Sequence, residues 1–201
     1  MKNIIYKILI VLIFPTLSCI AQNPVVAIDA SISETVDGAY FKDLNNEFNK
    51  FVGTWKFTNG NETLTIALKK GLMIYNGKDY QDELLGEYKY EISGLTVVNT
   101  LPNIDNTNPA KHNIRGNLII SHNQSINCDD CSENEKRVEL YFRDSERLYL
   151  TSHIILRYLE NENNSEKLTA TIYQYSSTIL PYANAPTVTR VPYDTYTMEK
   201  Q

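Results

Sequence analysis

The sequence lacks the motifs by which most enzymes are identified, and it has few histidines and cysteines. It has no Gly-x-Ser-x-Gly nucleophile motif, no phosphate-binding loop, no dinucleotide fingerprint and no His-Glu-x-x-His zinc motif. Its 201 residues include three histidines, His112, His122 and His153, which are isolated from one another. We therefore predict no metal site, no cofactor and no enzymatic activity.

The sequence also lacks a basic tract, and this argues against a nucleic acid partner. The formal net charge is −5, whereas proteins that bind nucleic acids gather lysine and arginine against the phosphates. The carboxylates of Asp105 and of the pairs Asp82-Glu83 and Asp129-Asp130 would support acid–base chemistry only if they converged in a cleft. We predict instead that they are solvated loop charges.

No apolar run is long enough to span a bilayer, which takes roughly 20 residues. The longest run, residues 8–14, follows Lys2 and Lys7 and precedes small residues, a pattern typical of a secretory signal peptide. We predict that residues 1–21 are this signal, and that the exported protein is periplasmic, outer-membrane-associated or secreted.

Two processed forms are compatible with the end of the signal. Small residues flank a cleavage point before Gln22, which suits the peptidase of soluble exports, and this is the form we favour. Leu17-Ser18-Cys19 also resembles the end of a lipoprotein signal, although Thr16 replaces its usual leucine. In that second form Cys19 would carry the lipid, and only then would the protein be attached to a membrane.

An Asn-Gly pair marks the clearest hairpin of the chain. Asn59-Gly60 favours a two-residue turn, because both residues tolerate positive φ. Apolar and polar residues alternate over 64–69, as expected of a strand with one buried face. The single tryptophan, Trp55, lies two residues after Gly53 on the preceding strand. We predict that Trp55 is a buried structural residue closing one end of the fold, and that Gly53 allows a close backbone approach.

The whole pattern predicts an all-β fold. About nine or ten short segments of strand character are joined mainly by short turns. No helical segment is long enough to connect two parallel strands. We predict one domain over residues 41–201, an antiparallel up-and-down β-barrel of roughly eight to ten strands, after an extended arm at 22–40. Apolar steps of three and four also predict one short amphipathic helix over 42–50. A two-sheet β-sandwich is the alternative.

A short helix followed by Gly-x-Trp resembles the start of a lipocalin barrel, in which the helix plugs one end and the tryptophan packs over the floor. The resemblance implies that a basic side chain from a late strand stacks on the indole of Trp55. Arg157 or Arg190 is the residue we expect there. A lipocalin-like barrel also allows a hollow interior that holds a ligand.

Cys128 and Cys131 are separated by two acidic residues, in a segment that we predict to be a loop. Because an exported protein meets an oxidising compartment, we predict a disulfide between them. A redox Cys-x-x-Cys site would need basic neighbours or a helix N-terminus to lower the thiol pKa. A zinc site would need two further ligands, and no spacing supports His122 as one of them.

Several segments spread over the chain resemble one family. They are Phe41–Glu47, Phe51–Trp55, Asn59-Gly60, Leu64–Lys70, Tyr80–Tyr88, Val98–Leu101, Lys111-His112 and the closing segment Tyr193–Gln201. In them the chain is similar to a family of secreted proteins from flavobacteria and their relatives, known only as a domain of unknown function. The resemblance covers nearly the whole mature chain. It implies a location in the cell envelope or outside the cell, and it implies no activity, substrate or catalytic residue.

Two functions are compatible with these features. The first is a non-enzymatic, lipocalin-like binding module whose barrel holds a small apolar or amphipathic ligand. The second is a structural or interaction protein of the cell envelope, with a filled barrel and recognition by its long loops. Tyrosines near the C-terminus can line a ligand or glycan surface, although on strands they more often serve packing. They are Tyr173, Tyr175, Tyr182, Tyr193 and Tyr196.

Overall fold

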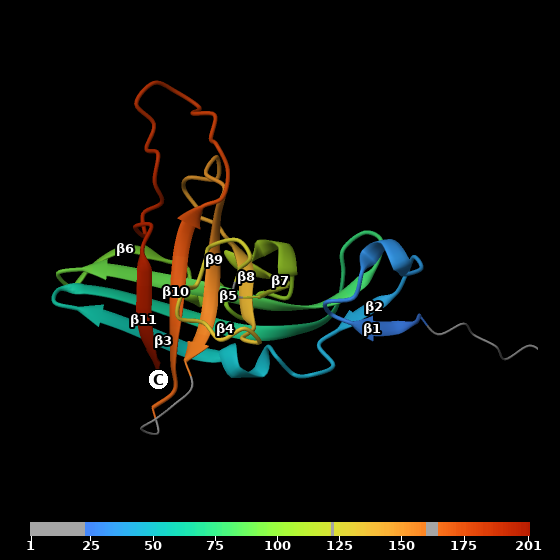
Figure 1. The fold of residues 1–201 in the computed structure, drawn as a ribbon. Helices are drawn as coiled ribbons and strands as arrows, with labels where there is room; N and C mark the ends of the chain where they lie inside the picture. Colours follow the sequence, from blue (N-terminus) through green and yellow to red (C-terminus); the bar gives the residue numbers. More distant parts are fainter. Residues whose placement is uncertain (1–22, 122, 160–164) are drawn as a thin grey trace, which may run out of the picture.

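Eight strands close into an antiparallel barrel (Figure 1), in a computed structural model that describes residues 23–121, 123–159 and 165–201. The strands follow one another around the ring in chain order, and β11 pairs with β3 to complete it. Their bounds are β3 Gly53–Asn59, β4 Glu62–Tyr75, β5 Tyr80–Ile92, β7 Ile114–Ile120, β8 Arg137–Phe142, β9 Ser152–Leu159, β10 Lys167–Gln174 and β11 Thr195–Lys200. The predicted barrel is confirmed, and the alternative sandwich does not form. The predicted signal peptide, residues 1–21 with Cys19, lies outside the described residues.

Three short strands lie outside the ring: β1 (Val25–Ala27), β2 (Tyr40–Lys42) and β6 (Leu95–Asn99). The long strand β5 pairs along one edge with β2, β7 and β6 in turn. β2 lies parallel to β5, and β1 lies parallel to β2. Figure 1 shows β4 and β5 running past the ring toward β1 and β2, so the extension of this hairpin holds the N-terminal arm.

The short helix predicted over residues 42–50 is wrong. The chain forms a turn there, followed by a single 3₁₀ turn at Asn49–Phe51. The carboxylate of Asp43 accepts hydrogen bonds from the backbone N–H groups of Glu47 (2.8 Å) and Phe48 (3.0 Å). Such bonds from a side chain to the nearby backbone compete with the helical pattern. Within the described ranges, no helix has the length and apolar character needed to cross a membrane.

Side chains fill the interior of the barrel. One cluster of buried apolar side chains occupies this interior, and none of its members is more than 5% exposed. A void able to hold water or a ligand would leave accessible surface on the side chains around it. The described part of the barrel therefore encloses no ligand-sized cavity. The largest of the filling side chains are Trp55, Tyr88, Phe48, Phe51 and Phe142.

Trp55 packs beneath the turn that leads into β3 and is fully buried. Its Nε1–H donates to the carbonyl oxygen of Phe51 at 2.7 Å, and the ring of Tyr158 meets it edge-on at a centroid distance of 6.4 Å. The Nζ of Lys200 lies 5.4 Å from the indole centroid. Gly53 has a φ of +134°, and a Cβ added there would lie 3.0 Å from the Cε of Lys200, so a larger residue would crowd this lysine.

The prediction that Arg157 or Arg190 stacks on the indole is wrong, since Lys200 occupies that place. The cation has to come from a strand next to β3, and that strand is β11, in which Lys200 is paired with Trp55. Both arginines are engaged elsewhere. Arg157 pairs with Glu135 at 2.6 Å, and Arg190 pairs with a buried aspartate at the end of β8.

Candidate functional site

Aromatic and polar side chains gather on the outer face of β8, β9 and β10. Tyr141 is paired with His153 between β8 and β9, and His153 is paired with Tyr173 between β9 and β10. The residues next to them along the strands, such as Leu140 and Ile154, are buried in the core. Because side chains alternate between the two faces of a strand, the three rings stand together on the outside of the barrel.

A buried carboxylate organises this face. Glu139 on β8 accepts hydrogen bonds from His153 Nδ1 at 2.6 Å, from the Tyr173 hydroxyl at 2.6 Å and from the Ser125 hydroxyl. Burial raises the pKa of Glu139, but the hydrogen bonds from Ser125, Tyr173 and His153 outweigh it, and the resulting pKa lies below the usual value. Glu139 is thus an ionised acceptor that fixes the orientation of the imidazole.

His153 is held by aromatic contacts and by a hydrogen bond at one ring nitrogen, and its other nitrogen has no partner among the described residues. The side chain is 9% exposed, stacks on Tyr175 at a centroid distance of 3.8 Å, and meets Tyr141 edge-on at 4.8 Å. Because Nδ1 faces the Glu139 carboxylate, Nδ1 donates this hydrogen bond, and in that tautomer Nε2 presents a lone pair. Within the described part of the chain, this buried Nε2 has no hydrogen-bond partner.

A cavity of about 250 Å³ lies against this cluster, with walls that include Asn117, Leu118, Tyr141, His153 and Tyr175. Tyr141 and Tyr175 are 61% and 58% exposed, so much of each ring is open to a ligand. The side-chain amide of Asn117 and the hydroxyls of both tyrosines make no hydrogen bond to other described residues. The cavity thus combines aromatic surface with several unpaired polar groups.

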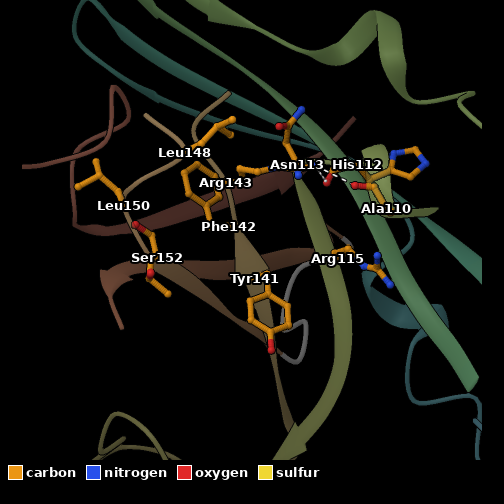
Figure 2. Close-up of a pocket in the computed structure, with 11 residues that line it drawn as sticks. Ala110, His112, Asn113, Arg115, Tyr141, Phe142, Arg143, Leu148, Leu150 and Ser152 are labelled. Carbon is orange, nitrogen blue, oxygen red and sulfur yellow. Dashed lines mark hydrogen bonds between the residues drawn. The ribbon is translucent and has the colours of Figure 1, made fainter. Parts of the chain in front are cut away.

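Two further hollows share walls with this cavity. One, of about 270 Å³, adjoins it at Tyr141, which lines both. Figure 2 shows Tyr141 on β8, with Ser152 and Arg115 on the strands to either side. The other, of about 240 Å³, shares Asn117 and Leu118 with the central cavity. The three hollows therefore form a series on the outside of the barrel.

The other described histidine, His112, belongs to a satisfied structural network. It is buried, its Nδ1 lies 3.1 Å from the Glu87 carboxylate, and its Nε2 lies 3.1 Å from the carbonyl oxygen of Asn106. Asn113 donates to the same carboxylate at 2.7 Å. Since both ring nitrogens have partners, His112 anchors the loop before β7 to β5. The remaining histidine, His122, lies outside the described residues.

The prediction that Asp82 and Glu83 are solvated is wrong, because both are buried on β5. Asp82 accepts a hydrogen bond from the Tyr40 hydroxyl at 2.6 Å, and Glu83 pairs with Arg115 at 2.7 Å. Their partners come from β2 and β7, which cover this edge of β5 and are distant in the sequence. The other carboxylates weighed from the sequence, Asp105, Asp129 and Asp130, are exposed.

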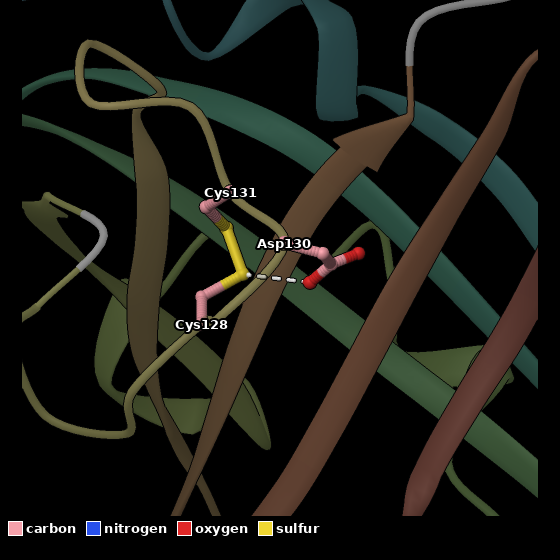
Figure 3. Close-up of side chains that lie close together, drawn as sticks. All are labelled: Cys128, Asp130 and Cys131. Atoms are coloured by element: carbon pink, nitrogen blue, oxygen red, sulfur yellow. Dashed lines mark hydrogen bonds between the residues drawn. A yellow bond between two sulfur atoms is a disulfide. The ribbon is translucent and has the colours of Figure 1, made fainter.

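The predicted disulfide between Cys128 and Cys131 is confirmed (Figure 3). A carboxylate oxygen of Asp130 lies 3.4 Å from the Sγ of Cys128. Because a bonded sulfur carries no proton, this approach is a close contact, and bonded sulfurs are not the thiolates that zinc requires. Asp130 also pairs with Arg157 at 2.7 Å, so the disulfide loop is tied to β9.

Replacing Cys128 and Cys131 together by serine should leave the barrel folded and cost less than about 2 kcal/mol, because the closed loop is very short. Arg157 holds the same loop through Asp130 and Glu135 without the disulfide. Circular dichroism should give a native spectrum and a melting temperature only a few degrees lower. A double variant that does not fold, or a wild-type protein whose thiols react without reductant, would contradict this prediction.

Acid should destabilise the protein. Burial raises the pKa values of Asp43, Glu139 and Asp144, but hydrogen bonds outweigh burial, and each folded-state pKa is lowered. The donors include Lys70 for Asp43 and Arg190 for Asp144. A lowered pKa stabilises the fold above the unfolded-state value of about 4, and this contribution is lost as the pH falls through the folded-state value.

Urea unfolding from neutral pH to about pH 3 should therefore show a free energy of unfolding that falls below about pH 4. The free energy of unfolding of the Glu139→Gln variant, which lacks one of the three carboxylates, should fall less steeply with decreasing pH. An unfolding free energy that stays constant across this range would contradict the prediction.

Neither Glu139 nor Tyr141 belongs to a recognisable sequence motif, and His153 is isolated from the other histidines in the sequence. Alternation over residues 137–143 does place Glu139 and Tyr141 on the polar side of a strand. The period of one strand does not give the register with β9 and β10, which brings His153 and Tyr173 to the same face as Tyr141. Polar residues repeated on the outer side of adjacent strands are the signal that could have found this site.

The chain belongs to a family of unknown function (DUF6705), which matches residues 1–201. No curated protein and no solved structure matches it. Since the function of the family is unknown, the function of this chain has to be argued from the chemistry of the site.

Proposed function

We propose that this protein is an exported, non-enzymatic binding module that holds a small amphipathic ligand on the outer face of its barrel, against Tyr141 and Tyr175. The observation that carries the proposal is the Nε2 of His153, which is buried beside a cavity without a partner among the described residues. Unpaired buried polar atoms are rare in native proteins. A ligand donor in the cavity would satisfy this one, while the tyrosine rings pack against the ligand's apolar part.

The filled interior favours the outer face over the barrel core as the place of binding. Lipocalin-type binding needs space inside the ring of strands, and here apolar side chains occupy that space. Exposed tyrosine rings and unpaired polar groups lie together where β7, β8 and β9 face outward, among the described residues that line this cavity. An amphipathic ligand needs both kinds of surface at once.

Export is supported by the N-terminal sequence, with its basic start, short apolar run and small residues. The Cys128–Cys131 disulfide is a bond that persists in oxidising compartments. Cleavage before Gln22 would leave a soluble periplasmic or secreted protein. Lipidation at Cys19 would instead hold it at a membrane.

The arrangement of Glu139 and His153 supports binding over catalysis. A carboxylate at Nδ1 also orients the imidazole in serine hydrolases, where the nucleophile sits at Nε2. Here Ser125 donates to Glu139, so its hydroxyl is on the carboxylate side. No hydroxyl or thiol of the described residues bonds to Nε2. The pair therefore serves as a rigid hydrogen-bond acceptor for a ligand.

Native mass spectrometry of protein purified from its own cells tests the proposal. Wild type should carry an adduct, and Tyr141→Ala/Tyr175→Ala should lose it. Tyr75→Ala/Tyr182→Ala is the matched control, since those tyrosines are also exposed and lie outside the cavity. An adduct retained by the site variant, or absent from wild type, would overturn the proposal.

An interaction protein that recognises its partner through a loop is the second candidate. The connection between β10 and β11 projects from the barrel (Figure 1), and it exposes Ile179, Tyr182 and Val188. Cross-linking in the producing cells would favour this candidate if a partner were lost in Ile179→Ser/Tyr182→Ser and kept in Tyr141→Ala.

A further inference from the structure

We infer that the ligand of the outer cavity is a neutral saccharide, held with the face of a sugar ring against tyrosine and its hydroxyls on Asn117 and His153. This inference rests on the proposed function and narrows its ligand class. It uses the shape, the hydrogen-bonding groups and the charge of the cavity, which are independent of one another.

The first argument is shape. Tyr141 meets the imidazole of His153 edge-on, with an interplanar angle of 76°, and Tyr175 stacks on it, with an angle of 9°. Their exposed surfaces are flat and rigid. The faces of a pyranose ring carry C–H groups, whose partial positive charge suits the negative face of an aromatic ring. A flexible acyl chain would gain less from such planes than from a deep apolar pocket.

The second argument is the set of unpaired polar groups. The side-chain amide of Asn117 can donate hydrogen bonds through its NH₂ group and accept them at its oxygen. The hydroxyls of Tyr141 and Tyr175 can each donate and accept as well. His153 Nε2 offers an acceptor alone, because Nδ1–H is committed to Glu139. Vicinal sugar hydroxyls each donate and accept, so they can satisfy all of these groups together. An apolar ligand would leave them unpaired, at a cost in affinity.

The third argument is charge and size. Glu139 lines the cavity as an ionised carboxylate, so an anionic sugar would be repelled. Arg115, the nearest arginine on β7, is already paired with Glu83. The volume of about 250 Å³ is below the roughly 300 Å³ typical of pockets for larger ligands. One ring therefore fits the cavity, and the hollows that share its walls would take the next rings of an oligosaccharide.

Saturation-transfer NMR on the full chain tests the inference. The probes are methyl glycosides of glucose, galactose, mannose and N-acetylglucosamine, with glucuronic acid as the anionic probe and laurate as the apolar one. At least one neutral glycoside should bind wild type, and glucuronic acid and laurate should bind more weakly. Binding should be lost in Tyr175→Ala and unchanged in Tyr75→Ala.

Two variants isolate the polar contacts. Asn117→Ala removes the amide, and His153→Asn keeps a donor for Glu139 while removing the acceptor at Nε2. Each should weaken glycoside binding by about 2- to 10-fold, the effect of one hydrogen bond. Tyr141→Phe should weaken it similarly while keeping the ring plane. Circular dichroism of each variant confirms that it is folded.

The outcomes separate the ligand class from the proposed function. If laurate binds and depends on Tyr141 and Tyr175 while no glycoside binds, the saccharide inference is wrong and the outer binding site stands. If no probe binds and the mass-spectrometric adduct does not depend on the two tyrosines, both are wrong. Glycoside binding that survives Asn117→Ala and His153→Asn unchanged would also overturn the inference, because the sugar would then lie elsewhere.

Discussion

Trp55→Ala should lower the free energy of unfolding by about 3–5 kcal/mol, the usual cost of truncating a buried tryptophan. The indole is fully buried, it packs against Tyr158, and its N–H satisfies the carbonyl of Phe51. Alanine would leave a cavity and an unpaired carbonyl, and it would remove the ring beneath Lys200. The loss is a large part of a typical total stability of roughly 5–15 kcal/mol.

Thermal unfolding measured by far-UV circular dichroism is the suitable assay, because the variant has no tryptophan for fluorescence. A loss of 3–5 kcal/mol corresponds to roughly 6–20 °C in a domain of this size. Trp55→Phe should recover part of the loss by refilling the space. Leu148→Ala is the control, since Leu148 is exposed and should change stability by less than about 0.5 kcal/mol. A Trp55→Ala protein melting within about 2 °C of wild type would contradict the structural role.

Asp144→Ala should lower the free energy of unfolding by about 3 kcal/mol, because it leaves the guanidinium of Arg190, a side chain only 11% exposed, without its main partner. Asp144 is almost fully buried and takes a hydrogen bond from Arg190 Nε at 2.9 Å and one from the Arg190 backbone N–H at 2.8 Å. Arginine cannot lose its charge to relieve the cost. The same contacts tie the end of the β10–β11 connection to the turn after β8.

Glu146→Ala supplies a matched control on the same arginine. The carboxylate of Glu146 is 2.5 Å from Arg190 Nη1, but its side chain is 72% exposed. Exposed ion pairs contribute about 0–1 kcal/mol, so this variant should stay close to wild type. Urea unfolding of both variants measures the difference. Equal effects of Asp144→Ala and Glu146→Ala would show that burial does not control the strength of this cluster.

At the candidate site, strand alternation predicts which face a side chain is on but does not predict its burial. Alternation over residues 137–143 places Glu139 outward, where a charged side chain is ordinarily solvated. It is buried because Ser125 reaches it from a loop and Tyr173 from β10, 34 residues away. Both contacts depend on strand register and on the course of a loop. Neither property follows from the period of a single strand.

The sequence by itself determined the features that depend on near neighbours. The Asn59-Gly60 turn, the alternating strands and the short Cys128–Cys131 spacing each act over a few residues, so the all-β barrel and the disulfide could be predicted. Only the tertiary structure decided that Lys200 lies over Trp55 and that the barrel is filled. These outcomes depend on which distant segments are brought together, because hydrophobic packing has no directional code in the local sequence.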